Sequence, residues 1–129
     1  MKPNSIMLVD DDPDLLATFE AVLYSKGYHV ISTANKAEAL KILQYTPPDL
    51  AILDLAMEEE HEGFELARHF RKHYPLTHVI MLTDTGDFTG LNFSSLENNK
   101  EWLPAEVYLE KPVTPSQLIN AVEEIFNKA

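Results

Sequence analysis

Acidic residues follow two apolar runs of the chain, and their positions are typical of a site for phosphoryl chemistry. Asp10 and Asp11 come directly after the run at residues 6–9, and Asp54 comes directly after the run at residues 50–53. Each short aliphatic run predicts a buried strand. Carboxylates crowded at one edge of a sheet repel one another, and a hard divalent cation bound through oxygen relieves that repulsion. Mg²⁺ is the leading candidate for this ion.

Two further polar residues follow predicted strands. Thr83 comes after the fourth strand and Lys111 after the fifth. In open α/β sheets ligands bind beyond the carboxyl ends of the strands, so three carboxylates, a hydroxyl and an ammonium group can converge there. The acids would hold Mg²⁺, one acid would attack a phosphoryl group, and the hydroxyl and the ammonium group would neutralise its oxygens.

The elements that position these residues alternate between strand and helix. We predict strands at residues 6–9, 29–33, 50–53, 79–82 and 107–109. Asp12 caps a first helix that ends at Gly27, and Asn35 opens a second. A third helix ends before Pro75, and Thr114 opens the last. This alternation predicts an α/β fold with a parallel sheet that is covered on both faces.

The segment at residues 84–106 breaks the pattern. Gly86, Gly90 and Pro104 interrupt any long helical periodicity there. We expect a loop with an irregular or extended fourth-helix region.

Length and composition restrict the function classes. The 129 residues fit a single domain, and the 45% apolar and 24% charged content is typical of a globular protein. Cysteine is absent, which excludes disulfides and thiolate metal sites. No apolar stretch approaches the roughly 20 residues that insert into a membrane, and no signal peptide is evident, so we expect a cytoplasmic protein. A net charge of -11 argues against direct nucleic-acid binding and favours protein partners.

Taken together, the strand-end motifs resemble a known family, the receiver domain of bacterial two-component response regulators (CheY-like). The motifs are Val9-Asp10-Asp11, Leu53-Asp54 with Met57, Leu82-Thr83, and Tyr108-Leu109-Glu110-Lys111-Pro112. The resemblance covers essentially the whole chain, so residues 1–129 would form one receiver domain. It implies a flavodoxin-like, doubly wound three-layer sandwich with five parallel strands in the order 2-1-3-4-5.

The resemblance also implies chemical roles. Asp54 would accept a phosphoryl group from the phosphohistidine of a sensor histidine kinase or a histidine phosphotransfer protein. Asp10, Asp11, Asp54 and the backbone carbonyl of Ala56 would bind Mg²⁺, with Asp10 acting mainly through a water molecule. Thr83 and Lys111 would contact phosphoryl oxygens.

A signalling role follows from the same resemblance. Tyr108 would be the switch aromatic, which turns inward when Thr83 moves, and a cis peptide would precede Pro112. The state change would appear on the face formed by the fourth helix, fifth strand and fifth helix, where a downstream protein or a second copy of the chain would bind. Such a protein is a switch and not an enzyme.

The chain departs from the family at three places, and two of them, the acidic loop after Asp54 and Asp84, favour an alternative, a pseudo-receiver that is phosphorylated poorly or not at all. Glu58 stands where the family usually has proline, within the acidic loop that runs from Glu58 to Glu62. Asp84 stands where the family prefers a small residue, and the stretch from Thr83 to Lys111 is about six residues longer than usual. We expect slow or selective phosphorylation, because every chemical residue is present.

Other interpretations of these residues are weaker. A phosphatase built on Asp10 and Asp12 would resemble haloacid-dehalogenase proteins, which usually carry extra cap segments. His69 and His73 are spaced four apart on a predicted helix and could chelate a transition metal, but no third ligand is evident. The chain ends about where the last helix should end, which suggests a stand-alone regulator, although a domain of a longer protein fits equally well.

Overall fold

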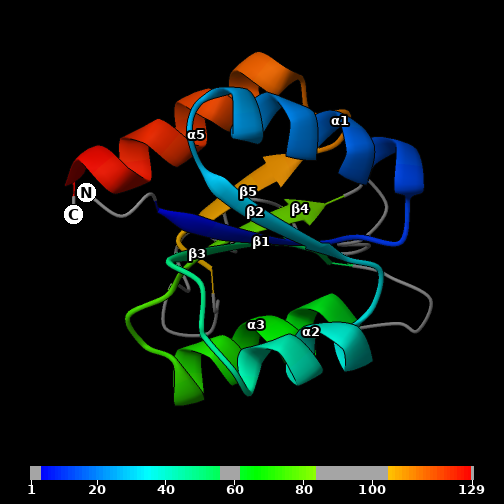
Figure 1. Cartoon of the computed structure of the whole chain (residues 1–129), viewed down its shortest axis with the longest axis vertical. Coiled ribbons are helices and arrows are strands. Elements are labelled where there is room, and N and C mark those ends of the chain that lie inside the picture. Colours follow the sequence, from blue (N-terminus) through cyan, green and yellow to red (C-terminus); the bar gives the residue numbers. More distant parts are fainter. Residues whose placement is uncertain (1–3, 56–61, 84–104, 129) are drawn as a thin grey trace, which may run out of the picture.

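The computed structural model describes residues 4–55, 62–83 and 105–128, which form a five-stranded sheet between two layers of helices (Figure 1). The strands are β1 (Ser5–Val9), β2 (His29–Thr33), β3 (Leu50–Asp54), β4 (His78–Thr83) and β5 (Val107–Glu110). The helices are α1 (Pro13–Ser25), α2 (Lys36–Leu43), α3 (Glu62–His73) and α5 (Pro115–Lys128). The irregular region that we predicted at residues 84–106 lies outside the described residues except for its last two.

All four strand pairings are parallel, and the strand order is β2-β1-β3-β4-β5. In Figure 1, α1 and α5 cover one face of the sheet, and α2 and α3 cover the other. The chain is therefore a doubly wound α/β sandwich, as the sequence and its resemblance predicted.

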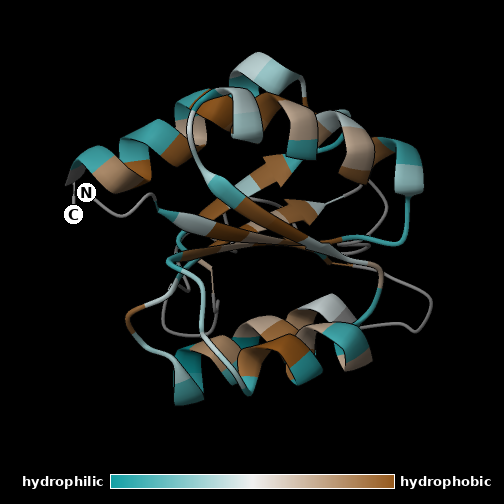
Figure 2. Ribbon diagram, viewed as in Figure 1, coloured by the Kyte–Doolittle hydropathy of each residue, from teal (hydrophilic) through white to brown (hydrophobic). Residues whose placement is uncertain are grey.

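Successive residues of each central strand face opposite sides of the sheet, which divides the core into two parts. Ile6 and Leu8 pack with Phe19 and Leu23 on the side of α1 and α5. The intervening Met7 belongs to the second cluster, on the side of α2 and α3. Figure 2 shows the consequence: brown, hydrophobic stretches run along the central strands, and brown and teal alternate along the helices. The continuous apolar runs in the sequence reflect strands that are buried on both faces.

Local hydrogen bonds start the helices where the sequence predicted. The Asp12 carboxylate accepts from the N–H groups of Asp14 and Leu15 at 3.0 and 3.3 Å, which satisfies donors that the first turn of α1 leaves open. Thr114 and Gln117 form a reciprocal capping box at α5, with distances of 2.9 and 3.1 Å. These caps fix where α1 and α5 begin, directly beyond the edge of the sheet that carries Asp10 and Lys111.

Among the residues that the structure describes, no helix combines the length and the apolarity that crossing a lipid bilayer requires.

Candidate functional site

The parallel register brings the predicted strand-end residues to one edge of the sheet. Asp54 is the last residue of β3 and lies opposite Leu82, so Thr83 of β4 is the next residue along the neighbouring strand. Lys111 follows β5, and its N–H donates to the Thr83 carbonyl. Asp10 follows β1, and its N–H continues the ladder to the Thr33 carbonyl at 3.2 Å.

Two buried carboxylates share one lysine at this edge. The Lys111 Nζ lies 3.1 Å from Asp10 Oδ2 and 3.3 Å from Asp54 Oδ1. Asp10 is 1% exposed and Asp54 is 2% exposed, whereas Asp11 is exposed to solvent. When all three carboxylates are ionised, Lys111 balances only one of them, and a net charge of about -2 remains.

The two buried carboxylates differ in how well they are hydrogen-bonded. Asp10 Oδ1 accepts from the Asp12 N–H at 2.9 Å, and Asp10 Oδ2 accepts from Lys111. Asp54 Oδ1 is buried and makes no hydrogen bond, because Lys111 reaches it at ion-pair distance without the alignment of a hydrogen bond. A buried polar atom without a partner is rare and calls for an explanation. Asp54 thus presents an unsatisfied oxygen at the edge of the sheet.

Burial controls the titration of the acids. It raises the pKa of Asp54 to about 7, with a further contribution from the negative charge of Asp10, and Lys111 offsets only part of this. Burial also raises the pKa of Asp10, although the hydrogen bond from the Asp12 N–H and the charge of Lys111 act to lower it. Burial alone would lower the pKa of Lys111, but Asp10 and Asp54 outweigh it and raise that pKa, so Lys111 stays charged.

The donor set fits a hard divalent cation. Asp10, Asp11 and Asp54 each offer a carboxylate oxygen, and these oxygens lie within 4.8 Å of one another. Carboxylate oxygens are the ligands that Mg²⁺ and Ca²⁺ prefer, and a dication would balance the excess negative charge. The absence of a hydrogen bond at the buried Asp54 Oδ1 supports this assignment, because a bound cation would give that oxygen a partner. The fourth predicted ligand, the carbonyl of Ala56, lies outside the described residues.

Thr83 and Tyr108 lie beside this acidic site. Thr83 is fully buried, and its hydroxyl donates to the Leu109 carbonyl at 3.5 Å, the limit of a hydrogen bond. The Tyr108 ring is partly buried and packs against the core cluster on the side of α2 and α3, and its buried hydroxyl oxygen lies beside the Ala105 backbone. Burial raises the pKa of Tyr108 to about 12, and the nearby Ala105 backbone and the Arg71 charge offset part of the effect.

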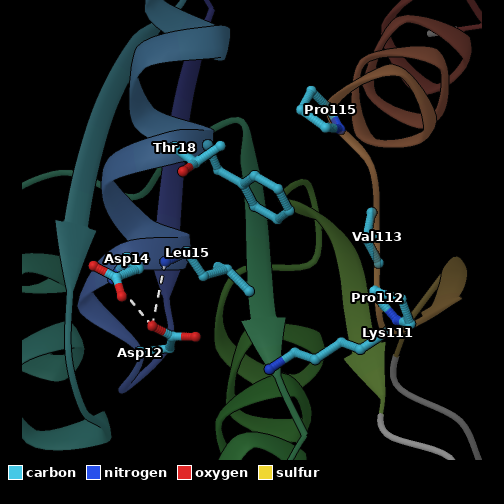
Figure 3. A pocket seen from close by; sticks show the side chains of 9 residues that line it. Asp12, Asp14, Leu15, Thr18, Lys111, Pro112, Val113 and Pro115 are labelled. Carbon is cyan, nitrogen blue, oxygen red and sulfur yellow. Dashed lines mark hydrogen bonds between the residues drawn. The ribbon is translucent and has the colours of Figure 1, made fainter.

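An open pocket of about 530 Å³ borders the site between α1 and the segment that joins β5 to α5. Figure 3 shows Lys111 at the end of this pocket, with Asp12 and Asp14 across from it. Leu15 and Val113 are among its apolar lining residues. The Lys111–Pro112 peptide bond is cis, as the resemblance implied. The pocket therefore gives solvent, or a partner, a path to the lysine side of the site.

The sequence did not reveal two contacts that shape the site. We assigned Asp12 only as a helix cap, yet its N–H also orients Asp10. Gly63, in the first turn of α3, lies so close to the backbone of Asp54 that a Cβ atom there would collide with the Asp54 carbonyl. The only signal in the sequence was a glycine directly after the acidic loop that runs from Glu58 to Glu62. Asp84 and the acidic residues 58–60 lie outside the described residues.

Comparisons with known proteins point to one family. The family model for the response regulator receiver domain matches residues 6–123. The chain is 32% identical over 128 residues to the transcriptional regulatory protein GlrR of Escherichia coli K12. The match covers 99% of this chain and 27% of GlrR. It is 34% identical over 128 residues to the transcriptional regulatory protein GltR of Pseudomonas aeruginosa. That match covers 98% of this chain and 50% of GltR. The chain thus spans between a quarter and a half of the length of these relatives.

Solved structures with similar folds agree. A response regulator receiver domain protein (CheY-like) from Methanospirillum hungatei JF-1 matches with a TM-score of 0.83 at 26% identity, over 98% of this chain and 96% of that one. A response regulator receiver domain protein from Clostridium thermocellum matches with a TM-score of 0.80 at 28% identity, over 97% of this chain and 95% of that one.

Proposed function

Since the chain belongs to the response regulator receiver domain family, whose members are signalling switches and not enzymes, we propose that Asp54 is its phosphoacceptor. A receiver domain implies a cognate histidine kinase as partner. The donor would be a phosphohistidine, on the kinase itself or on a histidine phosphotransfer protein. Residues 1–129 would act as one receiver unit, and the cytoplasmic location expected from the sequence stays a prediction.

The observation that supports this proposal is the placement of Asp54, whose buried carboxylate lies beside Asp10, Asp11 and Lys111 at the ends of the strands. A cation would take one of its two carboxylate oxygens, and the other would be the nucleophile. In the transfer, an Asp54 oxygen forms a P–O bond while the P–N bond of the phosphohistidine breaks. The electron pair of that bond returns to the imidazole nitrogen. The product is an aspartyl phosphate.

Lys111 and Thr83 would bind the negatively charged oxygens of the added phosphoryl group. Lys111 already lies 3.3 Å from Asp54 and can pair with a phosphoryl oxygen, so the incoming charge meets a cation that is in place. Thr83 holds the Leu109 carbonyl only weakly and can turn its hydroxyl toward the phosphoryl group at little cost. Mg²⁺ held by Asp10, Asp11 and Asp54, with the Ala56 carbonyl as the family implies, would supply Lewis-acid neutralisation of the phosphoryl oxygens.

Tyr108 would change its position when Asp54 is phosphorylated. Its ring is only partly buried, and no hydrogen bond of good geometry ties its hydroxyl in place, so the ring is weakly held. A small shift of Thr83 can therefore change the balance between a buried and an exposed ring. The exposed surface at β5 and α5 would change with it and alter binding of a downstream protein, a second copy, or further domains of the same polypeptide.

The direct test is the intact mass of the protein after incubation with acetyl phosphate. We expect a gain of one phosphoryl group that requires Mg²⁺ and is lost in Asp54→Ala. The matched control is Asp49→Ala, which removes an exposed carboxylate from the other end of β3 and should leave phosphoryl uptake intact.

The pseudo-receiver is the outcome that would replace this proposal. Its supporting features, Asp84 and the acidic residues 58–60, lie outside the described residues. An unchanged mass with Mg²⁺, acetyl phosphate and phosphorylated histidine kinases would assign the chain to that class. Reverting Asp84 to alanine would then show whether that carboxylate shields Asp54.

A further inference from the structure

Two histidines on α3 lie outside the acidic site, and their rings face each other. His69 and His73 are separated by one helical turn, and their ring centres are 4.5 Å apart with planes tilted by 45°. Positions four apart lie on the same face of a helix. His69 is half-buried and His73 is exposed. The spacing was visible in the sequence, but the approach of the rings was not.

The separation of the rings suits a shared metal ion. A metal–nitrogen distance of about 2.0–2.1 Å places the centres of two imidazoles roughly 4.5–5.2 Å apart when they occupy neighbouring positions of a square or tetrahedral shell. The observed 4.5 Å lies at the short end of that range. Rotation of the rings about their side-chain bonds would bring one nitrogen of each toward a common point.

The ring nitrogens are also available. Among the described residues, neither imidazole makes a hydrogen bond or an ion pair; the two rings contact each other, and the His69 ring also contacts Tyr74. Burial, together with the positive charges of His73 and Lys36, lowers the pKa of His69. The neutral ring that binds a metal is therefore favoured there.

Neighbouring charges limit the site to these two protein ligands. Glu65, one turn before His69, pairs with Lys36 of α2 at 3.0 Å. Its carboxylate does not join the histidines in a three-ligand cluster within the described part of the chain. Arg71 is rotated by roughly 200° around the helix from His69 and projects from the opposite side, whereas Lys72, three positions after His69, lies on the nearer side.

We propose that His69 and His73 form a surface site for a late first-row divalent metal ion such as Ni²⁺, Cu²⁺ or Zn²⁺. Imidazole nitrogen is a preferred ligand for these ions, whereas the carboxylates at the other site suit Mg²⁺. The two sites thus differ in chemistry and in place. Two protein ligands leave the remaining coordination positions to water, so the site binds and exchanges metal and does not support the fold.

Calorimetric titration of the untagged chain with Ni²⁺ in excess Mg²⁺ tests the proposal, since Mg²⁺ occupies the carboxylates. We expect one Ni²⁺ per chain. His69→Gln and His73→Gln should each weaken binding by about 100-fold, because a chelate becomes a single imidazole. His29→Gln removes an exposed histidine from β2 and is the matched control, with affinity unchanged. Unchanged affinity in either α3 variant, or a loss in His29→Gln, overturns the proposal.

A second measurement does not depend on variants. In the wild-type protein, paramagnetic Ni²⁺ should broaden the imidazole NMR signals of His69 and His73 together at the first additions. Broadening of another histidine before these two would overturn the proposal. Both α3 variants should retain phosphoryl uptake at Asp54, which shows that they fold.

Discussion

The two ends of β3 carry the same residue type in opposite circumstances. Asp49 precedes the strand, is exposed, and accepts from the N–H and hydroxyl of Ser5 at 2.8 and 3.4 Å. Asp54 ends the strand, is 2% exposed, and has an oxygen without a hydrogen bond. Asp49 ties β3 to β1, whereas Asp54 is costly to bury and Lys111 offsets only part of that cost. Unfavourable groups of this kind persist at functional sites, where the fold around them supplies the stability.

Two polar side-chain pairs at opposite ends of the strands also differ in exposure. At the amino edge, His78 lies 2.7 Å from Glu106, and both side chains are partly exposed, at 30% and 43%. At the carboxyl edge, Lys111 and Asp10 are 17% and 2% exposed. Water screens the first pair and hardly reaches the second, so a change of charge at the carboxyl edge has the larger effect.

The largest expected effect comes from removing the lysine of the buried edge. Lys111→Met should slow phosphoryl uptake at Asp54 by about 10²–10³-fold, as expected when a charge-stabilising donor is lost. The rate of mass gain with acetyl phosphate and Mg²⁺ measures it. His78→Gln, which breaks the exposed pair, should leave the rate unchanged. A normal rate in Lys111→Met would remove Lys111 from the reaction.

Replacing each aspartate of β3 should change stability in opposite directions. Without metal at pH 8, Asp54→Asn should raise the free energy of unfolding by roughly 1–3 kcal/mol, because it removes a poorly compensated buried charge. Asp49→Asn should lower it by about 0.5–1.5 kcal/mol through weakened bonds to Ser5. Urea unfolding with EDTA present measures both. Destabilisation by Asp54→Asn would mean that its carboxylate is better satisfied than the structure indicates.

The effect of Asp54→Asn should depend on pH. The pKa of Asp54 is raised from 3.8 to about 7 in the folded state, so between these values the folded protein binds more protons than the unfolded chain. The free energy of unfolding of the wild type therefore falls as pH rises through this window. Asparagine does not titrate, so the advantage of the variant should grow from pH 5 to pH 7 and then level off. A constant difference across this range would contradict the raised pKa.

The smallest expected effect is the difference in stability between Tyr74→Phe and Tyr108→Phe. The Tyr74 hydroxyl donates to the Leu43 carbonyl at 3.3 Å, whereas the Tyr108 hydroxyl is buried without a partner. Tyr74→Phe should lower the free energy of unfolding by about 0.5–1 kcal/mol, and Tyr108→Phe should leave it unchanged or raise it by about 0.5 kcal/mol. Paired urea titrations can resolve this difference in sign. A loss in Tyr108→Phe equal to that in Tyr74→Phe would indicate an acceptor outside the described residues.

The sequence was sufficient for the fold and for the place of the site. Apolar runs that each end in a polar residue predict parallel strands, and parallel strands bring Asp10, Asp54 and Lys111 to one edge. The strand ends were less accurate, because His78 and Thr83 belong to β4 through pairing with neighbouring strands. Pairing depends on residues distant in the chain, which a local pattern cannot include.

The contacts within the site were beyond prediction for the same reason. Lys111 and Asp10 are separated by 101 positions, and which carboxylate oxygen the lysine satisfies depends on side-chain rotamers. The collision that a Cβ at Gly63 would make with Asp54 depends on the approach of α3 to β3. The spacing of His69 and His73 was legible, but the distance between their rings was not.

Among the described strands, β5 pairs only with β4, and none of its residues reaches the full burial that all five residues of β3 show. Segments with few buried neighbours open without unfolding of the whole domain. Amide hydrogens of β5 should therefore exchange with deuterium before those of β3, which mass spectrometry of peptides can follow. The strand that carries Tyr108 and leads to Lys111 would then be a part of the sheet that can rearrange on its own, while β3 holds Asp54 in place.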